Sequence, residues 1–207
     1  MLRLACESSP LPQTADAALA HAGQGVARMQ RTLDQLLLLA RLDAVAPAPG
    51  ACSALEAARH AVQEAEAARN VCGRVLIEAA DSDSEAAVPE PVLVSALRNL
   101  LDNALQAAPD GRIILRIAAA APGLVALTVL DEGPGMTTDE CSRAVERFWR
   151  RGKSGQGSGL GLSIVNTIAQ RHGGSFVLQP RPEGGLEARI VLPAPPPSLA
   201  DFTAPAG

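Results

Sequence analysis

Four short motifs in a fixed order constrain this chain more than any other feature of its sequence. They are NLLDNA at 99–104, DEGPG at 131–135, RFW at 147–149 and GSGLGL at 157–162. Asparagine amides, an acidic turn and glycine-rich turns at the ends of predicted helices and strands are suited to binding phosphate and a hard metal ion. Together, the four motifs predict a pocket for a magnesium nucleotide.

The first motif lies on a predicted amphipathic helix over 91–108. Apolar residues recur at intervals of three and four, which is typical of such a helix; they are Leu93, Leu97, Leu100, Leu101, Ala104 and Leu105. Asn99 and Asn103 are then one turn apart on one face, and an amide oxygen suits Mg²⁺ beside waters and substrate phosphates. The alternative, that both amides serve only helix packing, is disfavoured because asparagine is a poor helix former.

The second motif follows a predicted strand over 124–130. The carboxylate of Asp131 can accept a hydrogen bond from an exocyclic amine, which adenine presents and guanine does not. Gly133 and Gly135 let the backbone approach a ligand closely. Taken alone, a DxGxG sequence is more simply an ordinary tight turn.

The fourth motif precedes a predicted helix over 160–171. Its glycines leave free N–H groups at a helix N-terminus, where phosphate binds; they are Gly157, Gly159 and Gly161. A P-loop does not fit, because Arg147 stands where GxxxxGK[ST] requires glycine. GxGxxG fails as well, since Leu162 occupies its last place.

In order and spacing, the four motifs resemble the N, G1, F and G2 boxes of the catalytic and ATP-binding domain of bacterial two-component sensor histidine kinases. The resemblance spans roughly residues 24–193. It implies that Asn103 binds Mg²⁺, that Asn99 lies at the phosphates and that Asp131 recognises adenine. It also implies that Phe148 anchors a flexible lid and that Arg150 reaches the γ-phosphate. The other nucleotide-binding residues that it implies are Gly133, Gly135, Gly157, Gly159, Leu160 and Gly161.

Four further positions refine the resemblance. Gly184 and Gly185 resemble the last glycine box of the family. Gln106 and Ala107 stand where the family often has a basic and an aromatic residue, so we expect modest nucleotide affinity.

The residue at 99 also bears on the reaction. Gyrase-like and Hsp90-like ATPases, which share this nucleotide fold, carry a glutamate one turn before the magnesium asparagine. Asn99 occupies that place here, and an amide has no useful basicity for activating water. Phosphoryl transfer needs in-line positioning and charge neutralisation instead. The resemblance therefore predicts transfer of the ATP γ-phosphate to a histidine, for relay to a response regulator, with release of ADP.

A coiled-coil seam occupies the region upstream. Apolar residues step by three and four along it; they are Leu19, Ala22, Val26, Met29, Leu33, Leu36 and Ala40. The stretch DQLLLLARLD at 34–43 resembles the end of the second helix of the family's dimerisation and histidine-phosphotransfer hairpin. Two such helical-hairpin arms would form a four-helix bundle in a homodimer. Packing of the arm on its own catalytic domain is the alternative.

The family's phosphorylated histidine lies in an HELRTP-like box on the first hairpin helix, and we expect that box before residue 1. Residues 8–12 would then form the hairpin turn. None of the three histidines present is a convincing substitute: we expect His21 and His60 to be solvated, and His172 to be charged at a helix C-terminus. The chain is thus expected to bind Mg·ATP without becoming phosphorylated. Either a piece of a longer membrane sensor kinase or a natural short protein would behave in this way.

Composition agrees with a cytoplasmic module. The net charge is −4, with no basic block beyond 147–153, which argues against a nucleic-acid partner. There is no run of 18 apolar residues and no signal peptide, so we expect no membrane contact by this segment. The four cysteines form no CxxC pair and suggest free thiols in a reducing compartment. The expected location is the cytoplasm, as the cytoplasmic part of an inner-membrane sensor kinase.

The predicted fold is α+β: a two-layer α/β sandwich with a mixed sheet and helices on one face, of the Bergerat type, preceded by the helical-hairpin arm. The predicted divisions are a partial dimerisation and phosphotransfer arm at 1–45, a linker at 46–52, the catalytic ATP-binding domain at 53–193 and a disordered proline-rich tail at 194–207. Strands are predicted at 74–78, 112–118, 124–130, 175–178 and 187–192.

Two other functions remain as alternatives. An anti-sigma-type serine kinase shares the nucleotide fold but lacks the heptad arm. An autophosphorylation-incompetent regulatory module that still binds nucleotide is the second. A purely interacting scaffold with a decayed site is disfavoured by the intact NLLDNA, DEGPG and GSGLGL motifs.

Overall fold

The computed structural model describes residues 13–44, 46–81, 84–151 and 158–196. Its helices are α1 (Gln13–Ala44), α2 (Ala54–Arg69), α3 (Glu90–Ala107), α4 (Thr138–Ala144) and α5 (Gly161–Arg171). Its strands are β1 (Cys52–Ser53), β2 (Val75–Ala79), β3 (Glu85–Ala86), β4 (Ile113–Ala121), β5 (Leu124–Asp131), β6 (Ser175–Pro180) and β7 (Leu186–Pro193).

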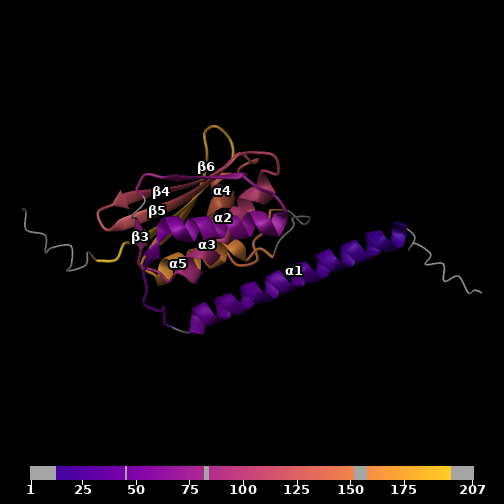
Figure 1. Cartoon of the computed structure of the whole chain (residues 1–207), viewed down its shortest axis with the longest axis horizontal. Coiled ribbons are helices and arrows are strands. Elements are labelled where there is room, and N and C mark those ends of the chain that lie inside the picture. The colour runs from indigo at the N-terminus through magenta and orange to yellow at the C-terminus, as the bar shows by residue number, and fades with distance from the viewer. Residues whose placement is uncertain (1–12, 45, 82–83, 152–157, 197–207) are drawn as a thin grey trace, which may run out of the picture.

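The main sheet has five strands in the order β2-β4-β5-β7-β6. The β2–β4 pair is parallel and the other pairs are antiparallel, so the sheet is mixed. Helices α2, α3 and α5 lie together along the sheet, and β1 and β3 form a separate small antiparallel pair (Figure 1). This arrangement confirms the predicted α+β sandwich.

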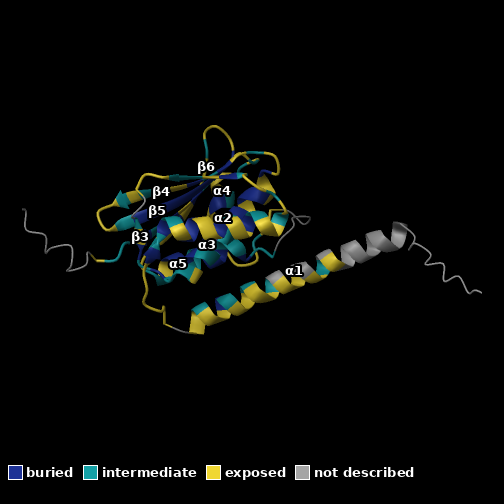
Figure 2. Cartoon of the chain, viewed as in Figure 1, coloured by how far each residue is buried: buried dark blue, intermediate teal, exposed yellow. Residues whose placement is uncertain are grey.

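The core lies between the sheet and these helices (Figure 2). Strand β4 alternates, and its buried residues Ile113, Leu115 and Ile117 are fully shielded from solvent. The apolar stripe predicted over 91–108 is the buried face of α3; its largest residues are Leu93, Leu97, Leu100 and Leu101, each at most 1% exposed. Each such leucine contributes about 2 kcal/mol by burial, which is why α3 is held firmly with its motif face outward.

Helix ends follow from capping chemistry. The Ser53 hydroxyl accepts from the Glu56 N–H at 3.3 Å, and Asn70 ends α2 in the left-handed conformation. Helix α4 starts with a reciprocal capping box between Thr137 and Glu140. Neither α4 nor the two-residue strands β1 and β3 were predicted from the sequence, because elements this short carry no measurable periodicity.

Helix α1 extends beyond the sandwich and contacts it near its C-terminal end (Figure 1). Leu39 is 3% exposed there, with Leu38 and Leu42 packed beside it. Toward the N-terminus of α1, a row of apolar side chains is 41–70% exposed: Val26, Met29, Leu33, Leu36 and Leu37. The hairpin turn predicted at 8–12 falls outside the described residues. None of the helices that the structure describes is long and apolar enough to cross a membrane.

The residues after β7 continue beside the sheet for a short distance. Pro193 pairs with Leu124 in the sheet, and Ala194 N–H donates to the Gly123 carbonyl at 2.8 Å. The backbone of the β4–β5 turn therefore holds the first residue of the predicted tail beside the sheet. Residues 197–207 lie outside the described part of the chain.

Candidate nucleotide-binding site

The asparagine face of α3 lies against the N-terminus of α5. A Cβ atom on Gly161 would stand 3.0 Å from Asn99 Oδ1 and 3.6 Å from Asn103 Nδ2. Glycine at this position thus allows the first turn of α5 to approach both amides. The two asparagines and the glycine-rich turn, separated by nearly sixty positions in sequence, are brought together as the motifs predicted.

Asn99 is half-buried and already bonded. Its Nδ2 donates to the Ser95 carbonyl at 2.8 Å, and its Oδ1 accepts from Gln35 Nε2 of α1 at 2.9 Å. Gln35 Oε1 in turn accepts from the Ser158 hydroxyl at 2.6 Å. Gln35 therefore bridges the motif helix and the glycine-rich turn. Sequence reasoning missed it, since it lies off the coiled-coil seam and in no nucleotide motif.

Asn103 and Leu160 complete this end of the site. Asn103 is exposed, so its amide is open to a ligand. Leu160 is fully buried directly before α5 and its carbonyl accepts from the Ile164 N–H at 2.9 Å. Leu160 thus holds the helix N-terminus in place by packing. Gly157 falls outside the described residues.

The two ends of the lid segment meet at Gly159. The Phe148 N–H donates to the Gly159 carbonyl at 2.9 Å, and a Cβ on Gly159 would lie 2.8 Å from the Trp149 carbonyl. Phe148 has φ +66 and its side chain is 62% exposed, whereas Trp149 packs against the core. The structure therefore differs from the prediction that Phe148 anchors the lid: the neighbouring indole is the ring that is packed.

Three arginines surround the start of the lid. Arg147 pairs with Asp43 of α1 at 2.9 Å. Arg151 pairs with Glu140 at 2.9 Å and donates to the Gly135 carbonyl at 2.8 Å. Arg150 is exposed, next to these two. Residues 152–157, the rest of the predicted lid, lie outside the described residues.

Asp131 ends β5 with its side chain in the interior, 5% exposed. One carboxylate oxygen accepts from the Gly133 N–H at 2.8 Å. Burial raises the pKa of this carboxyl, and the N–H groups of Gly133 and Leu186 and the charge of Arg181 act in the opposite direction. Asp131 is therefore a buried hydrogen-bond acceptor, and desolvation disfavours its ionised form.

Glycines pack the surroundings of Asp131 tightly. A Cβ on Gly133 would be 2.9 Å from the Ala107 carbonyl, and one on Gly135 would be 2.7 Å from the Gly185 carbonyl. A Cβ on Gly185 would lie 1.9 Å from the Asp131 carbonyl oxygen. The β6–β7 turn therefore lies directly on the end of β5. The sequence indicated a glycine box at 184–185, and the structure shows what it contacts.

The histidines are placed in three ways. His60 is exposed on α2, with Nδ1 2.6 Å from Glu90 Oε1. His172 ends α5; burial lowers its pKa, as does the charge of Arg171, and a hydrogen bond with the Ala87 backbone acts in the opposite direction. The side chain of His21 lies outside the described part of α1. Cys52, Cys72 and Cys141 are free thiols.

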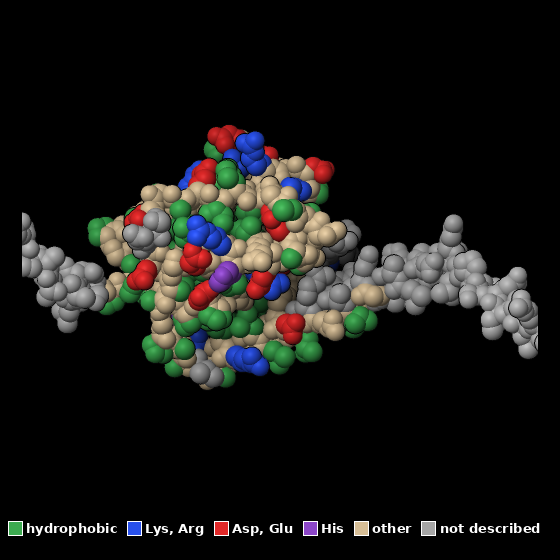
Figure 3. Space-filling view, viewed as in Figure 1, with side chains coloured by type: hydrophobic (Ala, Val, Ile, Leu, Met, Phe, Trp, Pro, Cys, Tyr) green, Lys and Arg blue, Asp and Glu red, His purple; other side chains and the backbone are tan. Residues whose placement is uncertain are grey.

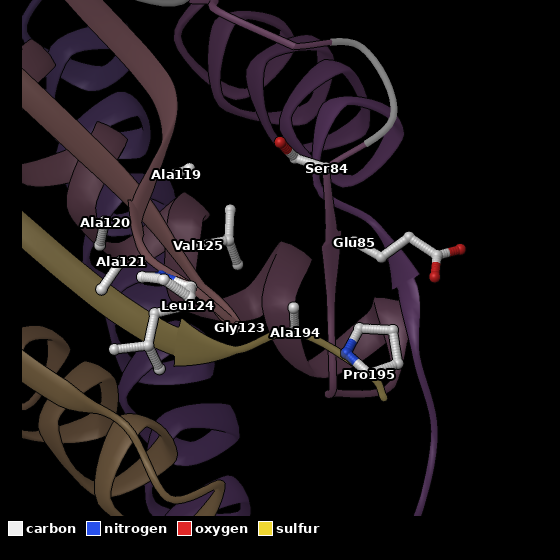
Figure 4. A pocket seen from close by; sticks show the side chains of 11 residues that line it. Ser84, Glu85, Ala119, Ala120, Ala121, Gly123, Leu124, Val125, Ala194 and Pro195 are labelled. Carbon is white, nitrogen blue, oxygen red and sulfur yellow. The ribbon is translucent and has the colours of Figure 1, made fainter. Parts of the chain in front are cut away.

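Two hollows of about 570 Å³ lie away from Asp131. One lies between α1 and helices α2 and α3, and Gln35, Arg98 and Asn99 are among its lining residues. The other is at the far end of the sheet, lined by the β4–β5 turn with the alanines before it and by Ala194 and Pro195; the Glu85 carboxylate is directed away from the alanines (Figure 4). On the face shown in Figure 3, acidic and basic side chains are interspersed. Neither hollow brings the predicted adenine and phosphate residues together.

Comparison with known proteins identifies the domain. Residues 89–196, more than half of the chain, match the family described as "Histidine kinase-, DNA gyrase B-, and HSP90-like ATPase". The chain belongs to that family. All motifs described above fall within the matched range, so the asparagine face, the Asp131 turn and the α5 N-terminus are features of its ATP-binding domain.

Its relatives are sensor kinases. The chain is 36% identical over 190 residues to Sensor protein QseC of Escherichia coli K12, covering 86% of this chain and 40% of that protein. It is 35% identical over 188 residues to Sensor protein kinase PmrB of Pseudomonas aeruginosa, covering 84% and 38%. The chain thus spans about two fifths of the length of these relatives, and the matching region is the ATP-binding catalytic region of a sensor kinase.

Solved structures agree on the fold. The mycobacterial sensor histidine kinase MprB superposes with a TM-score of 0.63 at 28% identity, over 72% of this chain and 99% of that one. Full-length ShkA in complex with AMPPNP superposes with a TM-score of 0.72 at 22% identity, over 91% of this chain and 40% of that one. The second match extends to most of the described chain and shows the same fold.

Proposed function

We propose that this chain is the phosphodonor part of a sensor histidine kinase, which binds Mg·ATP and delivers the γ-phosphate to a histidine outside residues 1–207. The observation that supports this most directly is the close approach of Gly161 to Asn99 and Asn103, which places an amide pair at a helix N-terminus. Such a terminus favours phosphate, and amide oxygens suit Mg²⁺. ShkA, which shares the fold, forms a complex with AMPPNP, an ATP analogue.

The residues take the following roles in this proposal. Asn103, exposed beside the α5 N-terminus, holds Mg²⁺, which neutralises phosphate charge when bound. Asn99 lies at the phosphates. The N–H groups of Gly159 and Gly161 bind phosphate oxygens, with the buried Leu160 fixing the turn, and Gly157 extends this set. Arg150 is exposed at the start of the lid and reaches the γ-phosphate on closure.

The base pocket forms at the end of β5. Asp131 accepts a hydrogen bond from the adenine amine, and Gly133 and Gly135 shape the turn around it. Phe148, exposed and adjacent to Gly159, is available to cover the nucleotide rather than to anchor the lid. Because its ring is exposed beside the glycine-rich turn, Phe148 contacts the nucleotide in this proposal.

The chemistry is transfer rather than hydrolysis. Asn99 stands where a water-activating glutamate would be needed, and its amide cannot take a proton at neutral pH. The residues present orient the triphosphate and neutralise its charge, which is most of what phosphoryl transfer requires. The recipient is a histidine on a hairpin of the kind to which α1 belongs, and a response regulator accepts the phosphoryl group from it.

The arm suggests the assembly and location. The exposed row from Val26 to Leu37 on α1 is suited to a homodimeric helical bundle. We propose that the chain consists of four segments: the arm at 1–45, a linker at 46–52, the catalytic domain at 53–193 and a tail at 194–207. We place this segment in the cytoplasm, where ATP and response regulators are found.

The test combines binding with labelling. Isothermal titration calorimetry of the purified chain should show Mg·ATP binding that weakens at least about tenfold in EDTA, because roughly 1.4 kcal/mol of phosphate binding depends on the ion. Asn103→Ala should remove the dependence on Mg²⁺, while Asn70→Ala, a change of the same residue type at the end of α2, should not.

Labelling separates donor from acceptor. With γ-labelled ATP, acid-labile label should not accumulate on this chain, since His60 and His172 lie outside the site. Acid-labile label on either residue would overturn the assignment of the acceptor. Absence of Mg·ATP binding in the calorimeter would overturn the function itself.

A further inference from the structure

Arg181, in the turn between β6 and β7, contacts the end of β5 at the predicted base pocket. Its Nη1 donates to the backbone carbonyl of Asp131 at 2.7 Å, and its side chain is 19% exposed. The turn that carries it is closed by two backbone bonds, Arg181 N–H to Gly185 O at 3.2 Å and Gly184 N–H to Arg181 O at 3.1 Å. The guanidinium is therefore held in one place.

The charge of Arg181 is little compensated. Its carboxylate partner, Glu183, lies at 3.1 Å but has a side chain that is 81% exposed, so solvent screens that pair. The acidic neighbour of Asp131, Glu132, is exposed and accepts from the Arg112 N–H at 2.9 Å. On the lid side, Arg151 binds the Gly135 carbonyl and Glu140. Whereas Arg151 and Arg112 contact neighbouring residues, the guanidinium of Arg181 contacts Asp131 directly, at its backbone carbonyl.

We propose that Arg181 is the positioning residue for adenine recognition, which binds the carbonyl of Asp131 and places a cation beside its carboxylate. This rests on the proposed function, in which that carboxylate accepts the adenine amine. Two effects are expected from one side chain. The hydrogen bond holds the end of β5 against the β6–β7 turn, and the charge opposes the desolvation that favours the protonated acid.

Protonation would change what Asp131 can recognise. A carboxylate only accepts hydrogen bonds, whereas a protonated carboxyl also donates one. The carboxylate matches the adenine amine, and the protonated group matches the carbonyl oxygen that guanine has in the same place. Arg181 is therefore expected to affect both the pH dependence of ATP binding and the preference for adenine over guanine.

The experiment measures Mg·ATP and Mg·GTP affinity by calorimetry between pH 5 and pH 8 for three variants. Arg181→Met should weaken ATP binding about tenfold at neutral pH, the equivalent of about 1.4 kcal/mol. It should also shift the acidic loss of binding to higher pH and narrow the ATP-to-GTP ratio. Arg181→Lys should restore the pH profile, because the charge is kept even if the carbonyl bond is weakened.

Arg189→Met is the matched control. It removes an arginine from the same hairpin, but one that is exposed and lies opposite Thr128 in the sheet. It should leave the pH profile unchanged. A merely structural role for Arg181 would lower affinity equally at every pH, and superimposable profiles for Arg181→Met and the unmodified chain would overturn the proposal. If the unmodified chain itself bound no ATP, the proposed function would fail instead.

Discussion

At the scale of single residues, two adjacent glycines differ in why a side chain would be unfavourable. At one, only the backbone conformation disfavours it, and at the other a steric clash is added. Gly184 and Gly185 both have positive φ, 94° and 87°. A Cβ on Gly184 meets nothing within 4 Å, whereas one on Gly185 would lie 1.9 Å from the Asp131 carbonyl oxygen. The first substitution therefore tests conformation alone, and the second tests the contact with the base pocket.

We expect Gly184→Ala to lower the free energy of unfolding by about 1 kcal/mol, the usual penalty for a left-handed alanine. Gly185→Ala should lower it by about 3 kcal/mol, because overpacking adds to the same penalty, and should also weaken Mg·ATP binding. Urea unfolding and calorimetry measure the two effects. Equal losses in the two variants would show that the turn yields without moving Asp131.

Asp131 is also where stability and binding oppose each other. Burial raises its pKa in the folded chain, so the folded state binds the proton more tightly than the unfolded state does. Between the unfolded and the folded pKa, stability falls as pH rises, and at neutral pH the ionised group is unfavourable for folding. Below the unfolded pKa, near 3.8, this cost is absent.

Asp131→Asn should therefore raise the thermal midpoint at pH 7, with a smaller gain at pH 4, while weakening Mg·ATP binding by about a hundredfold. The loss is about 3 kcal/mol, within the range for a hydrogen bond to a charged group. Differential scanning fluorimetry and calorimetry measure these quantities. Asp110→Asn, in the exposed loop after α3, is the control and should change neither. Unaltered ATP titration in the first variant would remove Asp131 from the pocket.

At the scale of elements, α1 and the nucleotide site share residues. The side chain of Gln35 is hydrogen-bonded to the Asn99 amide oxygen and to the Ser158 hydroxyl. Asp43 forms an ion pair with Arg147 at the start of the lid, and Leu39 is buried against the domain. A ligand that needs Asn99 must compete with these contacts. Ligand binding and arm docking are thus coupled, since a ligand favours the state in which its site is free.

Gln35→Ala should strengthen Mg·ATP binding about fivefold, because about 1 kcal/mol of competing hydrogen bonds is removed. Gln30→Ala, an exposed glutamine on the same helix, should have no effect. Calorimetry at one pH suffices for the comparison. A weaker affinity in Gln35→Ala would instead mean that Gln35 supports the site when nucleotide is bound.

At the scale of the whole molecule, the arm leaves apolar surface uncovered. Val26, Met29, Leu33 and Leu36 recur at intervals of three and four on α1 and are 41–70% exposed. A stripe of this kind is normally buried against another helix. In the homodimer proposed above, a second copy of the chain would cover this stripe.

Sedimentation velocity should show a monomer–dimer equilibrium that shifts with protein concentration. Leu33→Glu should make the chain monomeric at concentrations at which Gln30→Glu, on the same helix but off the seam, still dimerises. The unfavourable burial of a charge underlies the difference. A concentration-independent compact monomer in the unmodified chain would contradict the proposed homodimer.

Much of this molecule follows from local sequence pattern. The periodicity of 91–108 predicted α3 and its buried leucines, and the β-branched and aliphatic runs predicted the five strands of the main sheet. These features are local: a side chain's direction on a helix or strand is determined within a few residues. Phe148 shows the limit, because the choice of which lid aromatic packs depends on a left-handed backbone at that residue.

Tertiary structure alone decided the contacts between motifs. Nothing local predicts that Gln35 meets Asn99, 64 residues away, or that Arg181 meets Asp131, 50 residues away. The sheet order β5-β7-β6 brings the Arg181 turn onto the end of β5, and the docking of α1 brings Gln35 to the phosphate end. The sequence by itself determined an ATP-binding domain of the histidine kinase type, and it predicted the asparagine, aspartate and glycine positions of its proposed site. The fold decided which groups hold those positions, since partners distant in sequence are chosen by packing and not by propensity.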